Sequence, residues 1–233
     1  MLPMIKTPEK SVLPRSVPPS PADQTRAALI RAALKLFGRQ GFEGTSTREI
    51  AALAKANIGS IAYHFGGKEG LRAACANYIV ETIGGIAGAA MADTAGDVHG
   101  AEAAQTRLNT VLEAMVGFIV ARPEAGEFVQ FVLRELSQPS EALDIIYKGV
   151  FEPVHQRLCK IWAEATGEGA ESERTRITIF TLIGQVVYFR IAREAVLRRM
   201  AWTDIGPEQA RAIASVAVDN LAAILAARKG NKP

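Results

Sequence analysis

The sequence has 233 residues, of which 48% are hydrophobic and 22% are charged, a composition typical of a soluble protein with a core. Two cysteines are too few for a disulfide framework and fit a reduced, cytoplasmic setting. The net charge is +3, but residues 1–83 carry eleven Lys/Arg against six Asp/Glu, whereas the remainder carries sixteen against eighteen. The basic N-terminal third predicts a polyanionic partner for that part of the chain.

The first segment, residues 1–22, is rich in proline and has no apolar run of the kind found in signal peptides. We expect a flexible arm there. The most apolar run of the chain, at 177–189, has thirteen residues and is followed by Arg190. A bilayer span needs about twenty residues, so the sequence predicts no membrane insertion.

Residues 23–84 predict a small helical domain, because no run alternates apolar and polar side chains as a strand would. Apolar residues recur on one face of a first helix, which Asp23 would cap and Gly41 would end. A short second helix follows, where Ser46 and Glu49 have the spacing of a capping box.

The third predicted helix, "IGSIAYHF", would be capped by Asn57 and is followed by "GGKEG" and a longer helix. Two short helices joined by a small turn in a basic segment indicate a helix-turn-helix, whose second helix enters the major groove of DNA. Small side chains such as Ser60 let its backbone approach the bases. Tyr63 and His64 can donate to phosphate, and Lys68 opens the next helix, whose dipole favours anions.

The run "GFEGTSTREIAALAKANIGSIAYHFGGKEGL", residues 41–71, resembles the DNA-binding domain of the TetR family of bacterial transcriptional regulators. The resemblance implies an all-α protein with an N-terminal three-helix helix-turn-helix domain and a larger helical domain for ligand binding and dimerisation. It also implies which side chains face DNA: Thr47, Arg48, Asn57, Ser60, Tyr63, His64 and Lys68.

Three positions depart from the family pattern. Lys55 stands where the turn usually has glycine, Ala62 where a tyrosine is frequent, and Ile58 where a basic residue is common.

Three of the predicted contacts also have a plainer interpretation. His64 could pack against the first helix, Lys68 could be an ordinary solvated lysine, and Arg48 could pair with a neighbouring carboxylate.

Residues 85–233 are expected to form the regulatory domain. The helices predicted there end near Pro123 and Pro139, and Pro153 should kink or split a third. A long helix is expected over about 171–199, and the last helix should run from Pro207 to about 228. The run "FVLRELSQPSEALDIIYKGVFEPVHQRL" resembles the ligand-binding domain of the CerR-like branch of the family.

A regulator of this kind needs a homodimer, because a double-stranded operator has two half-sites and one helix-turn-helix reads one of them. The run at 177–189 is apolar nearly all round, and the last helix carries a matching apolar stripe. We therefore expect a dimer through the last two helices. A fully internal helix in a larger core is the alternative.

A switchable regulator also needs a pocket for a small-molecule effector, whose identity the sequence leaves open. Arg134 could anchor an anionic group there, or could instead belong to an internal salt bridge. Large or polar side chains at helical spacing can equally be plain core. The candidate pocket residues on the central helices are Met115, Phe118, Phe131, Arg134, Tyr147, Trp162, Gln185 and Tyr188.

A helical small-molecule enzyme is the rival function, because His155 and Cys159 are four residues apart on one predicted helix. The chain has three histidines and two cysteines, no G-x-S-x-G and no phosphate-binding glycine loop, so we expect no enzyme, metal site or cofactor. A protein-interaction module would leave the basic N-terminal segment unexplained. The sequence therefore predicts a TetR-type repressor that a small-molecule effector releases from its operator.

Overall fold

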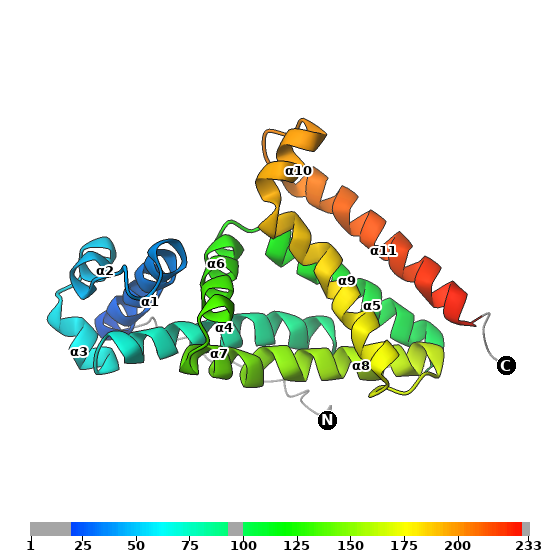
Figure 1. Cartoon of the computed structure of the whole chain (residues 1–233), viewed down its shortest axis with the longest axis horizontal. Coiled ribbons are helices and arrows are strands. Elements are labelled where there is room, and N and C mark those ends of the chain that lie inside the picture. Colours follow the sequence, from blue (N-terminus) through cyan, green and yellow to red (C-terminus); the bar gives the residue numbers. More distant parts are fainter. Residues whose placement is uncertain (1–19, 93–99, 230–233) are drawn as a thin grey trace, which may run out of the picture.

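The computed structural model describes residues 20–92 and 100–229, and every regular element within them is a helix (Figure 1). The expected fold class is therefore confirmed. The proposed flexible arm lies outside the described residues, except for Ser20, which precedes the first helix, and residues 21–22, which belong to it. The first three helices form one end of the molecule, and the C-terminal helix lies at the other (Figure 1).

The N-terminal domain has the helix order predicted from the sequence. Ser20 caps the first helix, and Asp23 completes a capping box from within it, rather than acting as the cap. The second predicted capping box, between Ser46 and Glu49, is present as expected. The helices are α1 (Pro21–Gln40), α2 (Thr47–Ala54), α3 (Gly59–Phe65) and α4 (Lys68–Ala90).

The turn between α2 and α3 is built by Lys55 and Asn57. Lys55 has φ 52° and ψ 39°, the left-handed conformation for which glycine is usually selected. The side-chain oxygen of Asn57 accepts a hydrogen bond from the Gly59 N–H at 2.8 Å, so Asn57 caps the start of α3 as predicted.

The glycine-rich string after α3 is a tight reversal into α4. Gly66 and Gly67 have φ values of 72° and 139°, which side-chain-bearing residues rarely adopt. A Cβ on Gly70 would lie 1.8 Å from the Phe65 carbonyl oxygen. These glycines hold the end of α3 against the start of α4, which brings the two predicted DNA-facing helix ends together.

The C-terminal domain contains two π-helical segments, η1 and η2. The helix expected to kink or split at Pro153 is not split: α7, η2 and α8 follow one another without a gap, and the π-helical turn of η2 ends two residues before Pro153, which has no N–H to donate. The single helix expected over about 171–199 is in fact two, because the chain turns at Ala192 so that Leu197 enters the core. The elements are α5 (Ala101–Met115), η1 (Val116–Val120), α6 (Glu124–Ser137), α7 (Glu141–Ile146), η2 (Tyr147–Phe151), α8 (Glu152–Thr166), α9 (Glu173–Ile191), α10 (Arg193–Met200) and α11 (Pro207–Lys229).

Two hydrophobic clusters hold these helices together. One joins α1–α4 to α6, α7 and η2, and the other joins α5, α8, α9 and α11. Phe37 of α1 contacts Phe131 of α6, with ring centroids 6.4 Å apart. The N-terminal helices therefore share a core with the helices behind them. The boundary expected between residues 84 and 85 lies within α4.

Candidate DNA interface and effector cavity

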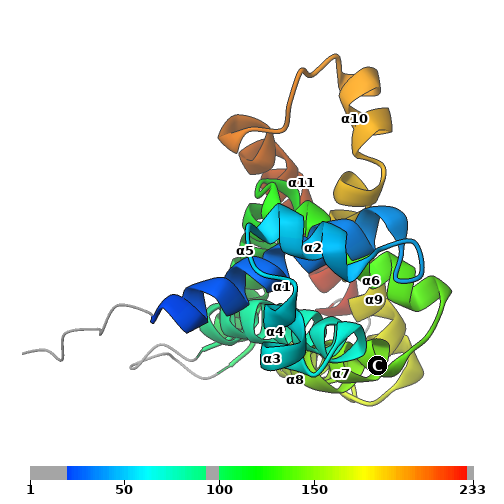
Figure 2. The same cartoon turned by 90° about the vertical axis from the view of Figure 1, so that its left-hand side faces the viewer.

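One face of α3 is open to solvent, and it lies at the end of the molecule seen in Figure 2. Ile61 is 2% exposed and anchors the opposite face in the core. On the open face, Tyr63 is 82% exposed and Ile58 is 47% exposed, with Ala62 beside them. Asn57 is also exposed at the start of the helix. This face is therefore the part of α3 that a large partner can reach.

The other predicted DNA-facing residues are placed around this open face. Ser60 and His64 are half-buried, and the His64 ring lies edge-on to Tyr63 with 4.9 Å between ring centroids. On α2, Arg48 is exposed and Thr47 is half-buried in the first turn. The sequence marked Ile58 and Ala62 as departures from the family pattern and assigned neither a DNA contact, whereas the structure shows that both are exposed.

Lys68 and Arg72 lie one turn apart at the start of α4, over the same ring. The Lys68 Nζ is 4.2 Å from the centroid of Phe42, and the Arg72 guanidinium is 4.5 Å from it. Both contacts are cation–π interactions, which fix the direction of these side chains. Arg72 forms an ion pair with Glu135, so Lys68 is the one of these two cations that can bind a phosphate.

A buried ion pair links α4 to α6. The Arg72 guanidinium donates to both carboxylate oxygens of Glu135, at 2.9 and 2.8 Å, and the Ser140 hydroxyl donates to the same carboxylate at 2.5 Å. The side chains of Arg72 and Glu135 are 14% and 3% exposed. Sequence reasoning missed Arg72 as the partner, because 63 residues separate it from Glu135.

Arg134, considered as an effector anchor or as part of an internal contact, is not among the residues that line the apolar cavity described below. Its guanidinium donates to the carbonyl oxygens of Gly38 and Arg39, at 3.4 and 3.1 Å, near the end of α1. The last carbonyls of a helix have no partner within it, so an arginine is well suited to satisfy them. Arg134 therefore attaches α6 to α1.

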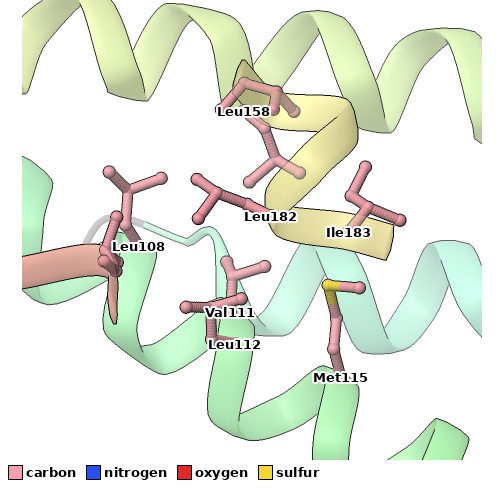
Figure 3. Close-up of a pocket in the computed structure, with 9 residues that line it drawn as sticks. Leu108, Val111, Leu112, Met115, Leu158, Leu182 and Ile183 are labelled. Carbon is pink, nitrogen blue, oxygen red and sulfur yellow. The ribbon is translucent and has the colours of Figure 1, made fainter. Parts of the chain in front are cut away.

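The described part of the chain contains a small apolar cavity between α5, α8, α9 and α11 (Figure 3). In this conformation it has room for little more than one water-sized group. Met115 is the member of the predicted pocket set that lines it. The lining residues are Leu108, Val111, Leu112, Met115, Leu158, Ile179, Leu182, Ile183 and Leu221.

The remaining predicted pocket residues lie elsewhere. Phe118 and Phe131 belong to the cluster that joins α6 to the N-terminal helices. Trp162 is fully buried in the other cluster, where its Nε1 donates to Glu168 at 2.9 Å. Helical spacing predicted that these side chains face inward, but it did not distinguish core from cavity.

Three more members of that set lie on α9 and η2. Tyr147 and Tyr188 are 51% and 58% exposed, so they face solvent. Gln185 accepts a hydrogen bond from the Asn220 amide at 3.1 Å, which joins α9 to α11.

The outer face of α9 carries apolar side chains in contact with solvent. Ile177, Phe180 and Ile191 are 55%, 62% and 55% exposed, while Leu182 and Val186 on the other side are buried. Val216 on α11 is 58% exposed. Both sides of α9 therefore carry apolar side chains, as the sequence predicted.

By length and composition alone, α11 passes the test for a membrane-crossing helix, with 28% of the tested window buried inside the protein. A core helix of a soluble protein passes the same test, so this is weak evidence for a membrane span.

His155 and Cys159 are close, but their chemistry does not fit an activated nucleophile. The Cys159 sulfur is 3.7 Å from His155 Nδ1 and 1% exposed, and burial raises the pKa of its thiol. A raised pKa keeps the thiol protonated, whereas nucleophilic cysteines need a lowered one. No group of three or more metal-ligating side chains occurs within residues 20–92 and 100–229.

Comparison with known proteins matches both halves of the chain to families. Residues 29–75 match the model of the bacterial regulatory proteins of the tetR family, and residues 104–228 match that of the C-terminal domain of the HTH-type transcriptional dual regulator CecR. CecR of Shigella flexneri is 33% identical over 195 residues, covering 82% of this chain and 86% of that protein. The regulatory protein RaaS of Mycobacterium tuberculosis is 48% identical over 63 residues, covering 27% and 29%.

Solved structures share the fold. A putative transcriptional regulator from Pseudomonas aeruginosa PAO1 has a TM-score of 0.61 and 23% identity, covering 90% of this chain and 93% of that one. AibR in complex with isovaleryl coenzyme A and operator DNA has a TM-score of 0.60 and 19% identity, covering 83% and 96%. At these identities the likeness is one of fold.

Proposed function

Because this chain belongs to the TetR family of bacterial transcriptional regulators, in its CecR-like branch, we propose that it is a homodimeric repressor released from its operator by a small apolar effector. As a member of the family it is a DNA-binding regulator and not an enzyme. The open face of α3, with Tyr63 82% exposed, is the observation that carries the proposal.

The proposed DNA contacts divide between bases and phosphates. Asn57 and Ser60 lie near the start of α3, where a recognition helix meets base edges. Tyr63, and His64 from the flank of α3, would donate to the DNA backbone. The proposed phosphate contacts of the other elements come from Thr47, Arg48 and Lys68.

The proposed dimer uses α9 and α11. Two recognition helices must lie about 34 Å apart to enter successive major grooves, so a symmetric pair is needed. The exposed apolar side chains of Ile177, Phe180, Ile191 and Val216 support this face as the interface. The same pairing would cover the exposed Val216 of α11, which fits a cytoplasmic regulator.

The proposed effector site is the cavity between α5, α8, α9 and α11. Its lining is aliphatic apart from the thioether of Met115, so it favours an apolar molecule or an apolar chain. Since the cavity is narrow, a larger effector must spread these helices. The effector therefore binds more tightly to an arrangement with spread helices than to the DNA-binding form. This difference in affinity shifts the population away from the DNA-binding form.

Operator selection from random DNA, followed by binding measurements at several salt concentrations, tests the proposal. We expect a palindromic site and a steep loss of affinity as salt rises, because phosphate contacts release counterions. Mapping of bound DNA in cells should find the same site near promoters. Failure to prefer any sequence over random DNA would show that the proposal is wrong.

A further inference from the structure

Ile58 is an exposed aliphatic side chain at the start of the recognition helix. It is 47% exposed and belongs to neither hydrophobic cluster of the described residues. The inward anchor of α3 is Ile61, which is 2% exposed. Packing of the domain therefore gives no reason for an aliphatic residue at position 58.

The backbone around Ile58 is fixed by a local hydrogen bond and is followed by a residue without a side chain. The Asn57 side chain accepts from the Gly59 N–H at 2.8 Å, which fixes the entry into α3. Gly59 has no side chain, and a Cβ there would lie 3.3 Å from the Asn57 oxygen. The residues at the start of a recognition helix are those that meet base edges, and here the backbone can come close to them.

Chemistry selects one partner for Ile58. A branched aliphatic side chain neither donates nor accepts hydrogen bonds, so it gains nothing from a phosphate. In the major groove, the apolar feature of a base pair is the C5-methyl group of thymine. Ala62 adds a second exposed methyl group one turn further along the same face.

We propose that Ile58 contacts the C5-methyl group of a thymine in each operator half-site and so makes that base a determinant of specificity. The inference rests on the proposed function, since it needs α3 to lie in the major groove. Tyr63 and Lys68 then position the helix on the backbone, and Ile58 reads sequence.

The test removes single methyl groups from the DNA. In the selected operator, each thymine is replaced in turn by deoxyuridine, which keeps the hydrogen bonds and lacks the C5-methyl group. Binding of the full chain is measured by fluorescence anisotropy. We expect one pair of symmetric positions at which the wild type loses about three- to fivefold in affinity per half-site, the value of one buried methyl group.

Two variants assign the effect to a residue. Ile58→Ala should bind the thymine operator less tightly and no longer distinguish thymine from deoxyuridine. Leu53→Ala is the matched control, because Leu53 is 45% exposed but lies on α2, and this variant should keep the full sensitivity. Circular dichroism checks that both variants are folded.

The proposal is overturned if the wild type tolerates deoxyuridine at every position, a result that needs no variant. It is also overturned if Ile58→Ala retains the sensitivity of the wild type. A chain that selects no operator refutes the proposed function and this inference together, whereas a selected operator without methyl sensitivity refutes this inference alone.

Discussion

Lys68 and Arg72 show how two like charges one turn apart can have different roles. Both lie over the Phe42 ring, but Arg72 is paired with Glu135 while Lys68 lies in the first turn of α4. A lysine in that position combines its own charge with the positive end of the helix dipole. Lys68 is therefore a proposed DNA contact, whereas Arg72 is a structural cation.

Lys68→Ala should weaken binding to operator and random DNA to a similar extent. One fewer phosphate contact should lower the magnitude of the salt slope by about one. The measurement is a salt titration of DNA binding. Lys160→Ala, which removes an exposed lysine from α8, is the control and should leave the slope unchanged. An unaltered slope for Lys68→Ala would show that this ammonium does not touch the backbone.

At the scale of elements, α6 connects the DNA-binding helices to the rest of the molecule. Glu135 holds α4, Arg134 holds the end of α1, and Phe131 packs against Phe37. A movement of α6 would therefore carry α1 and α4 with it. This makes α6, together with α4, the route by which the proposed cavity could change the spacing of the recognition helices.

Arg134→Met should lower stability and leave the response to an effector intact. The variant loses hydrogen bonds to two carbonyls of α1, worth about 1 kcal/mol at this exposed position, or roughly 2–4 °C in melting temperature. Arg199→Met, at an exposed position on α10, is the control and should melt like the wild type. A changed effector dose with an unchanged melting temperature would contradict this role.

Glu135→Gln should destabilise the protein strongly, because it removes the negative charge that pairs with Arg72 in a buried place. Removing one partner of a buried pair costs about 3–5 kcal/mol, measured here by urea unfolding. Replacing both partners, as Arg72→Met with Glu135→Leu, should recover much of that loss.

The matched control for that pair is Glu194→Gln. Its ion pair with Arg198 has side chains that are 71% and 79% exposed, so its loss should not be measurable. Equal unfolding curves for Glu135→Gln and Glu194→Gln would show that the link between α4 and α6 contributes nothing.

At the scale of the whole molecule, the outward side chains of α9 belong to the proposed dimer interface. Val187 is half-buried, whereas Phe180 is 62% exposed, so Phe180 is the better probe of the proposed interface. Phe180→Glu should give monomers in analytical ultracentrifugation and lose tight operator binding, since a charge would be buried between copies. Its control is Tyr147→Glu, which alters a residue 51% exposed on η2 and should still sediment as a dimer. Dimers of Phe180→Glu would place the interface elsewhere.

The sequence by itself determined the features that depend on neighbours along the chain. The capping box of Ser46 and Glu49, the Asn57 cap and the glycine reversal before Lys68 all form within a few residues, so their spacing was enough to predict them.

The tertiary structure alone decided which buried side chains meet. Arg134 lies 96 residues from Gly38, and Arg72 lies 63 from Glu135, so periodicity could mark them as inward or polar but could not pair them. The lining of the cavity depends on packing for the same reason: Phe131 and Leu182 both face inward, but Leu182 lines the cavity between four helices and Phe131 does not. Local hydrogen bonds are encoded by spacing, whereas long-range contacts depend on how whole faces fit together.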